Sequence, residues 1–166
     1  MFSNMYLLFI TALIPMAVGM VYYHPKVVGT AWMKSNGFTT EDIQGGNMPL
    51  ILGLSYLFAL ILSFLLSGMV IHQAAIISLM FPDSIDNTAA WQAVQEAMAP
   101  YMDRHRSFTH GLTHGIFYGV LFAGAVIGTN SLFERRGWKY ILIHVGYWAI
   151  TMGLMGGVLC QFLEFA

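Results

Sequence analysis

The sequence has very few charged side chains. Only 7 Lys and Arg and 8 Asp and Glu occur in 166 residues, so 9% of the chain is charged, against about 25% in an average soluble domain. So few charges cannot cover the surface of a water-soluble domain of this size. The 57% hydrophobic content equally excludes a disordered chain. The composition therefore predicts a membrane protein.

Several motifs are absent as well. Cys160 is the only cysteine, so the chain has no intramolecular disulfide and no CxxC metal site. It contains no Walker loop, dinucleotide fingerprint, nucleophile elbow, kinase element or HExxH motif. No basic tract indicates a nucleic-acid partner. These absences argue against the common soluble enzyme classes and against nucleic-acid binding.

Four long windows contain no Asp, Glu, Lys or Arg: 1–25, 43–82, 107–133 and 140–163. A bilayer-spanning helix needs about 20 predominantly apolar residues. The windows therefore predict an all-α integral membrane protein with one membrane domain over 1–166. Its four transmembrane helices are expected at 4–23, 49–71, 112–133 and 140–162. Buried core helices of a soluble fold are the alternative, which four separate windows disfavour.

Two of these spans raise questions of their own. Residues 1–23 lack the basic region and the cleavage site of a signal peptide, so we expect a retained helix. The second apolar stretch extends to residue 81, and as one helix from residue 48 it would be about 51 Å long. The hydrocarbon core is about 30 Å thick. We therefore expect this helix to project from the membrane or to break, most readily at Gly68.

The loops differ in their basic residues. The first loop carries two and the short third loop three, against two in the second loop, and neither terminus carries any. The first loop has Lys26 and Lys34, the second has Arg104 and Arg106, and the third has Arg135, Arg136 and Lys139. The positive-inside rule predicts first and third loops in the cytoplasm and both termini outside a bacterial inner membrane.

Short helices are expected in two loops. Residues 25–36 begin with Pro25 and are followed by Gly37, which suits a helix start and end. Residues 88–99 follow a capping residue, Asp86 or Asn87, and carry an apolar stripe. We expect both helices to lie at the membrane surface, with a partner-binding or gating element as the alternative. The expected interfacial side chains are Trp32, Trp91, Trp138, Arg135 and Arg136.

Small residues recur every four positions within the spans. The rows are Gly111, Gly115, Gly119 and Ala123 in the third span, Ala149, Gly153 and Gly157 in the fourth, and Ala59, Ser63 and Ser67 in the second. Such rows let helix backbones approach closely. Because the rows outnumber what one tight bundle needs, we expect a homo-oligomer or a subunit of a larger complex. The alternative is that glycine is simply common in membrane helices.

The histidines are the candidate metal-binding residues. His110 and His114 lie four residues apart on one helical face, and His72 ends the second apolar stretch at the same depth. With Asp103 and His105 nearby in sequence, these residues are compatible with zinc, iron or haem. The alternatives are polar residues bonded to backbone, headgroup or water, and a proton-responsive group. We predict no resident cofactor except bound lipid, with zinc or haem as the alternative.

One stretch resembles a known family. The letters YYHP stand at 22–25, G at 29, AWMK at 31–34 and GFT at 37–39. They resemble the first-loop signature of small bacterial membrane proteins catalogued as domain of unknown function 1761. The ERR turn at 134–136 and GY at 146–147 resemble its C-terminal half. The resemblance implies a four-helix inner-membrane protein and no particular activity.

The predicted spans contain no Asp, Glu, Lys or Arg, which argues against an ion pump or a proton-coupled transporter. We therefore predict a non-enzymatic multi-pass membrane protein, an oligomerising or accessory subunit. One alternative is a small channel or carrier for a neutral solute. Its uncharged path would use Ser63, Ser67, Thr113 and Tyr118. A second alternative is a metal-dependent membrane enzyme at the outer histidines.

Overall fold

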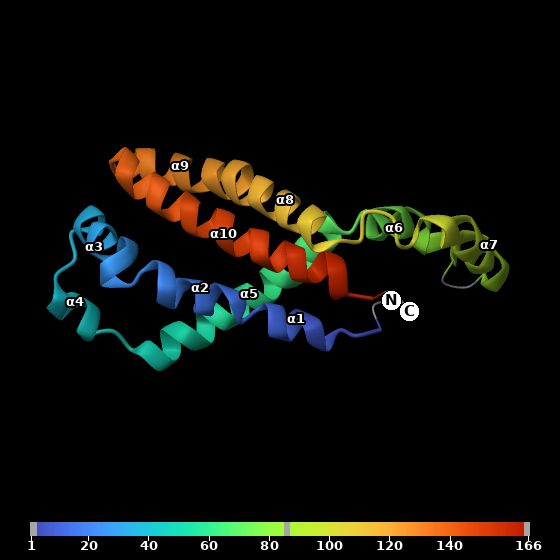
Figure 1. The fold of residues 1–166 in the computed structure, drawn as a ribbon, viewed down its shortest axis with the longest axis horizontal. Coiled ribbons are helices and arrows are strands. Elements are labelled where there is room, and N and C mark those ends of the chain that lie inside the picture. Colours follow the sequence, from blue (N-terminus) through green and yellow to red (C-terminus); the bar gives the residue numbers. More distant parts are fainter. Residues whose placement is uncertain (1–2, 85–86, 165–166) are drawn as a thin grey trace.

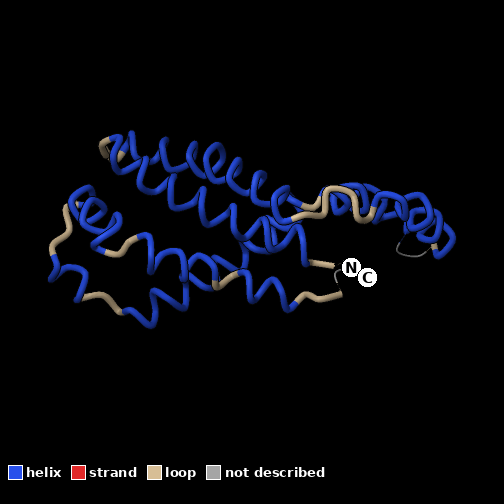
Figure 2. Tube along the Cα trace, in the orientation of Figure 1, coloured by secondary structure: helices blue, strands red, loops and turns tan. Residues whose placement is uncertain are grey.

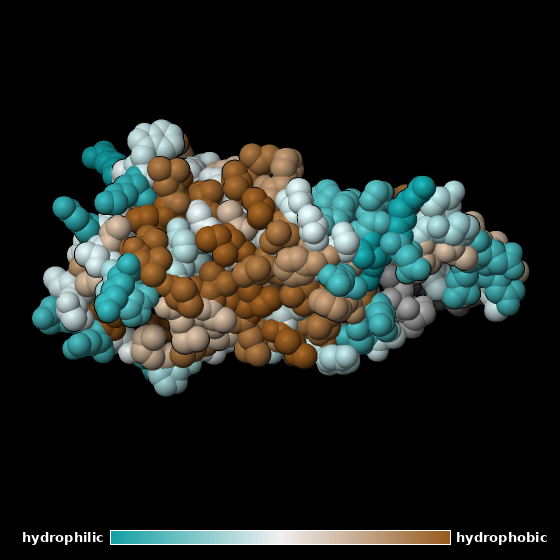
Figure 3. Space-filling view, viewed as in Figure 1, coloured by the Kyte–Doolittle hydropathy of each residue, from teal (hydrophilic) through white to brown (hydrophobic). Residues whose placement is uncertain are grey.

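The computed structural model describes residues 3–84 and 87–164, without the side chains of 77 and 80–84. All regular elements within these ranges are helices, joined by short loops (Figure 2). Hydrophobic side chains form a broad band around the middle of the face in Figure 3, and hydrophilic side chains gather at both ends. This distribution is typical of a protein that crosses a bilayer.

Three helices are long and apolar enough to cross a membrane: α5 (Met48–Val70), the helix Phe108–Phe133, and α10 (Trp138–Phe162). A fourth crossing exists if the bent pair Tyr6–Tyr22 and Pro25–Asn36 counts as one span. The described residues therefore form an all-helical protein with three helices, or up to four, that are long and apolar enough to span a membrane.

The first predicted span is not one continuous helix. It divides into α1 (Tyr6–Thr11) and α2 (Ile14–Tyr22), because Pro15 has no N–H to donate to the preceding turn. After α2 the chain bends by 58° into a π turn (Pro25–Gly29) and α3 (Thr30–Asn36). Gly37 ends α3 with a φ of 73°, a left-handed conformation that favours glycine.

The long second stretch breaks, but not at the expected residue. After α4 (Thr40–Gln44), α5 begins behind Asn47, whose side chain accepts a hydrogen bond from the Leu50 N–H. Gly68 is helical, so the prediction of a break there is wrong. The interruption lies at Ile71, which is extended and fully buried. The break is therefore stabilised by the burial of the Ile71 side chain and does not depend on the flexibility of Gly68.

Helices α6 (His72–Ser84) and α7 (Thr88–Met98) project beyond the spans at the end that holds both termini (Figure 1). Asn87 caps α7 through the Ala90 N–H, and the other candidate cap, Asp86, lies outside the described residues. Val94 and Met98 are buried on the packed face of α7. A single turn at 99–101 leads back to the spans.

The third span contains α8 (Phe108–Tyr118), a π turn (Gly119–Ala123) and α9 (Gly124–Phe133). It packs along α10 (Figure 1). The Ser3 N–H donates to the Glu164 carbonyl at 2.9 Å, so the first and last described residues share one end. At the other end Arg136 donates to the Asn36 carbonyl at 3.4 Å and joins the third loop to α3.

Candidate metal centre

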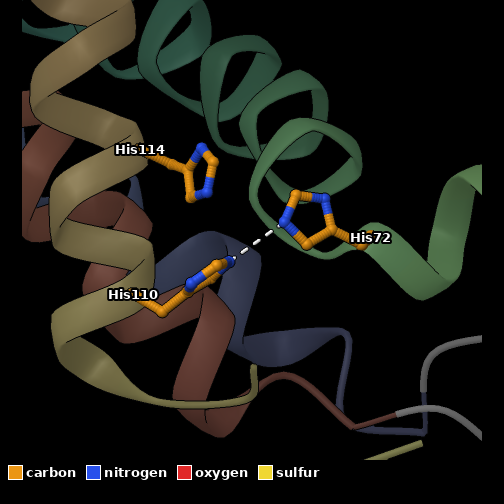
Figure 4. Close-up of side chains that lie close together, drawn as sticks. All are labelled: His72, His110 and His114. Atoms are coloured by element: carbon orange, nitrogen blue, oxygen red, sulfur yellow. Dashed lines mark hydrogen bonds between the residues drawn. The ribbon is translucent and has the colours of Figure 1, made fainter. Parts of the chain in front are cut away.

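Three histidines converge where α5, α6 and α8 meet. His72 begins α6, while His110 and His114 lie on successive turns of α8. One ring nitrogen from each lies within 4.8 Å of the other two, and the rings point toward one another (Figure 4). The Nε2 atoms of His72 and His110 are 3.0 Å apart.

Local structure explains this convergence. The break at Ile71 turns the chain so that His72 stands at the start of a new helix. On the other side, the Ser107 hydroxyl accepts a hydrogen bond from the His110 N–H and fixes the start of α8. His114 then follows one turn later on the same face.

Gln73 holds the second loop beside this cluster. Its side chain is only 5% exposed, and its Nε2 donates to the carbonyls of Tyr101, Met102 and Arg104 at 2.8, 3.2 and 2.8 Å. Sequence reasoning missed this role. The available signal was an amide at the end of an otherwise apolar stretch.

His105 lies next to the three histidines. Its ring stacks on His110 with centroids 5.1 Å apart, and it stands 6.4 Å from His72. Its φ is 62°, a region that residues other than glycine rarely adopt and that occurs preferentially at functional sites. The Cys160 thiol donates to its carbonyl at 3.3 Å.

Asp103 lies apart from the cluster. Together with Met102, Arg106, Gln161 and Glu164 it lines a polar cleft of about 400 Å³. Burial lowers the pKa of Arg106, while the nearby carboxylates act in the opposite direction. Of the five predicted site residues, the structure therefore brings three together, places His105 beside them, and puts Asp103 in a separate cleft.

Three imidazoles suit one transition-metal ion. Zinc binds imidazole nitrogen at about 2.0–2.1 Å, so small side-chain rotations would bring the three nitrogens to ligating distance. Imidazole also suits copper, iron and nickel. The His72 and His110 rings would have to separate to admit a haem between them, since their nitrogens are 3.0 Å apart. Among the described residues, no carboxylate belongs to this ligand group.

The glycine row of the third span packs within the chain. A Cβ on Gly111, Gly115 or Gly119 would lie 2.6–2.7 Å from backbone atoms of α10. On α10, Ala149 and Gly153 provide part of that backbone. Further along α10, Gly157 lies against the ring of Phe108. These rows thus pack α8 against α10 within one chain.

Ala123, the last residue of the predicted row, is partly buried against the core cluster. It is the last residue of the π turn and lines an apolar groove together with Leu62, Phe122 and Trp148. Gly124, the next residue, also faces α10, because its Cβ position lies 3.5 Å from Val145.

The predicted interfacial residues occupy both ends. Trp138 is 75% exposed at the start of α10, and Trp32 packs on Tyr23 with centroids 5.4 Å apart. Arg136 pairs with Glu134 at 3.5 Å. The remaining two are Arg135, which has a φ of 56°, and Trp91, which is half-buried on α7.

The polar side chains predicted to line a solute path do not form a chain of hydrogen bonds across the bundle among the described residues. Ser67 donates to the Phe64 carbonyl and Thr113 to the Thr109 carbonyl, each within its own helix. Between the two ends of the bundle lies an apolar core that includes Leu66 and Met155, both fully buried. This packing gives the channel alternative no support.

Comparison with known proteins gives one match. No curated protein and no solved structure matches the chain. A family model described as a protein of unknown function (DUF1761) matches residues 7–160. The match covers nearly the whole described bundle, and the chain belongs to this family.

Proposed function

We propose that this membrane protein binds one divalent transition-metal ion through His72, His110 and His114. The observation that carries the proposal is their convergence within 4.8 Å from two separate helices. His105 is the nearest further imidazole and a candidate fourth ligand. Zinc is the preferred ion, because it accepts neutral imidazoles and four-coordinate geometry.

The role proposed for the site is metal capture by an accessory membrane subunit. A hydrolytic metal enzyme would need a general base near the ion. Among the described residues, the ligand group consists of imidazoles alone. An oligomer would have to use surfaces other than the α8–α10 rows, such as the exposed apolar side of α5, where Phe58 and Leu57 are more than half exposed.

The proposal includes a membrane orientation. If the bent N-terminal pair counts as a fourth span, the first and third loops lie at one end and the metal site at the other. The basic residues of those loops favour a cytoplasmic location for them in a bacterial inner membrane. The histidine site would then face the outside, at the mouth of the bundle.

Metal titration tests the proposal directly. The purified full chain in neutral detergent is expected to bind one Zn²⁺ or Co²⁺ per chain, measured by calorimetry and by cobalt absorption. His72→Asn, His110→Asn and His114→Asn should each weaken affinity by at least about 100-fold, because even outer-shell changes cost about 10–100-fold.

His24→Asn is the matched control. His24 is exposed at the opposite end, where its ring accepts a hydrogen bond from the Lys26 N–H, and asparagine can replace that cap. We expect its metal affinity to equal that of the unaltered chain. Absence of stoichiometric uptake, or equal losses in the His24 and His72 variants, would refute the site.

A further inference from the structure

We propose that the end formed by the first and third loops binds one anionic phospholipid. An acyl chain occupies a groove between α2 and α10, and Lys26 binds the headgroup phosphate at its mouth. This site lies at the opposite end of the bundle from the histidines and does not depend on metal binding.

The groove is shaped for an acyl chain. Its volume is about 530 Å³, and it is lined by Ala17, Val18, Val21, Tyr22, Val27, Ile150 and Leu154. The two tyrosine hydroxyls beside it are already bonded inside the protein. Tyr22 donates to the Ile143 carbonyl at 3.0 Å, and Tyr147 donates to the Pro15 carbonyl at 2.9 Å. The groove therefore presents apolar surface and no free hydroxyl from these residues.

The π turn places a cation directly before a residue that lines the groove. His24 caps the turn through the Lys26 N–H at 3.2 Å. Gly29 closes it, since a Cβ there would lie 2.9 Å from the His24 carbonyl carbon. Val27 consequently lines the groove and is 59% exposed. Lys26, the residue before it in sequence, is exposed, and the proposal places its ammonium at the mouth of the groove.

Charge complementarity selects an anionic lipid. This end carries Lys26, Lys34, Arg135, Arg136 and Lys139. The ion pair described at this end joins Arg136 to Glu134. Lys26 has no ion pair with the described residues, so its ammonium is available. The hydrophilic end next to the apolar band is visible in Figure 3. Basic pockets beside membrane helices bind anionic headgroups in this way.

The test is thermal unfolding of the full chain in neutral detergent with added lipid. Phosphatidylglycerol is expected to raise Tm by about 3 °C or more relative to phosphatidylcholine with the same acyl chains, because a ligand stabilises the folded state that binds it. Lys26→Gln should remove most of this difference. Ala17→Phe, which fills the groove with an aromatic ring, should remove it too.

Two matched controls make the result specific. Arg104→Gln removes one positive charge from an exposed residue at the opposite end of the bundle, and Ala125→Phe adds the same ring to an exposed residue of α9. Both should keep the phosphatidylglycerol effect. Three results would overturn the proposal: equal shifts with both lipids, equal losses in the Lys26 and Arg104 variants, or the same stabilisation by inorganic phosphate alone.

Discussion

Replacing Gly115 with alanine is expected to lower the free energy of unfolding by about 3 kcal/mol, the upper part of the range for an overpacked core. The added Cβ would lie against the Met152 carbonyl, 2.6 Å from its carbon and 2.8 Å from the Gly153 Cα. These are backbone atoms, so no side-chain rotation relieves the clash. The helices α8 and α10 would have to move apart.

Gly128→Ala on the same span is the control. Nothing lies within 4 Å of its Cβ position, and alanine is favoured over glycine inside a helix by about 1 kcal/mol. Reversible unfolding in a denaturing detergent, followed by circular dichroism, measures both variants. Equal stability of the Gly115 and Gly128 variants would contradict the close α8–α10 contact. Because α8 carries His110 and His114, the Gly115 variant should also bind metal more weakly.

Gln73→Glu is the second change with a large expected effect. Glutamate has nearly the same shape, but it replaces the amide that donates to three carbonyls with an oxygen that repels them. Gln73 is 5% exposed, and a buried acceptor left without a donor costs about 1–3 kcal/mol, more when it is charged, so we expect a loss of about 3 kcal/mol. Hydrogen exchange should show faster opening at residues 99–106.

Loosening this loop also frees His105 from its place against His110. The Gln73 variant should therefore bind metal several-fold more weakly even though no ligand of the three-histidine group has changed. Gln92→Glu, an exposed glutamine on α7, makes the same chemical change and should leave both exchange and affinity unaltered. Unchanged exchange at 99–106 in the Gln73 variant would show that these hydrogen bonds do not hold the loop.

Hydropathy located three spans because transfer of a helix into lipid depends on local composition alone. Breaks inside helices were harder to predict. Pro15 was visible in the sequence, but its effect on α1 and α2 depends on how the two pieces pack. The break at Ile71 carries no local signal, because isoleucine is an ordinary residue for a membrane helix. It arises from tertiary contacts, the buried Ile71 side chain and the Gln73 hydrogen bonds.

The candidate site was also predictable only in part. Helical spacing placed His110 and His114 on one face, and the end of the apolar stretch placed His72 at the same depth. The positions of His105 and Asp103 depend on the path of a loop, which sequence spacing does not determine. His105 has a left-handed backbone conformation, and the chain changes direction there. As a result, Asp103 and His105 are close in sequence but lie in different places, one in the polar cleft and one beside the histidines.

The π turn at Gly119–Ala123 has a consequence for any helical wheel drawn through the third span. A π turn holds one residue more than an α turn, and each residue of an α-helix advances the wheel by about 100°. A wheel with one uniform phase would therefore put Ala123 in line with Gly119 and would rotate Ser131, which is 1% exposed, away from the packed side. The span is better described by two helical wheels, one for α8 and one for α9, with the second shifted by one residue to account for the π turn. Together they give one contact face over the full length of the span.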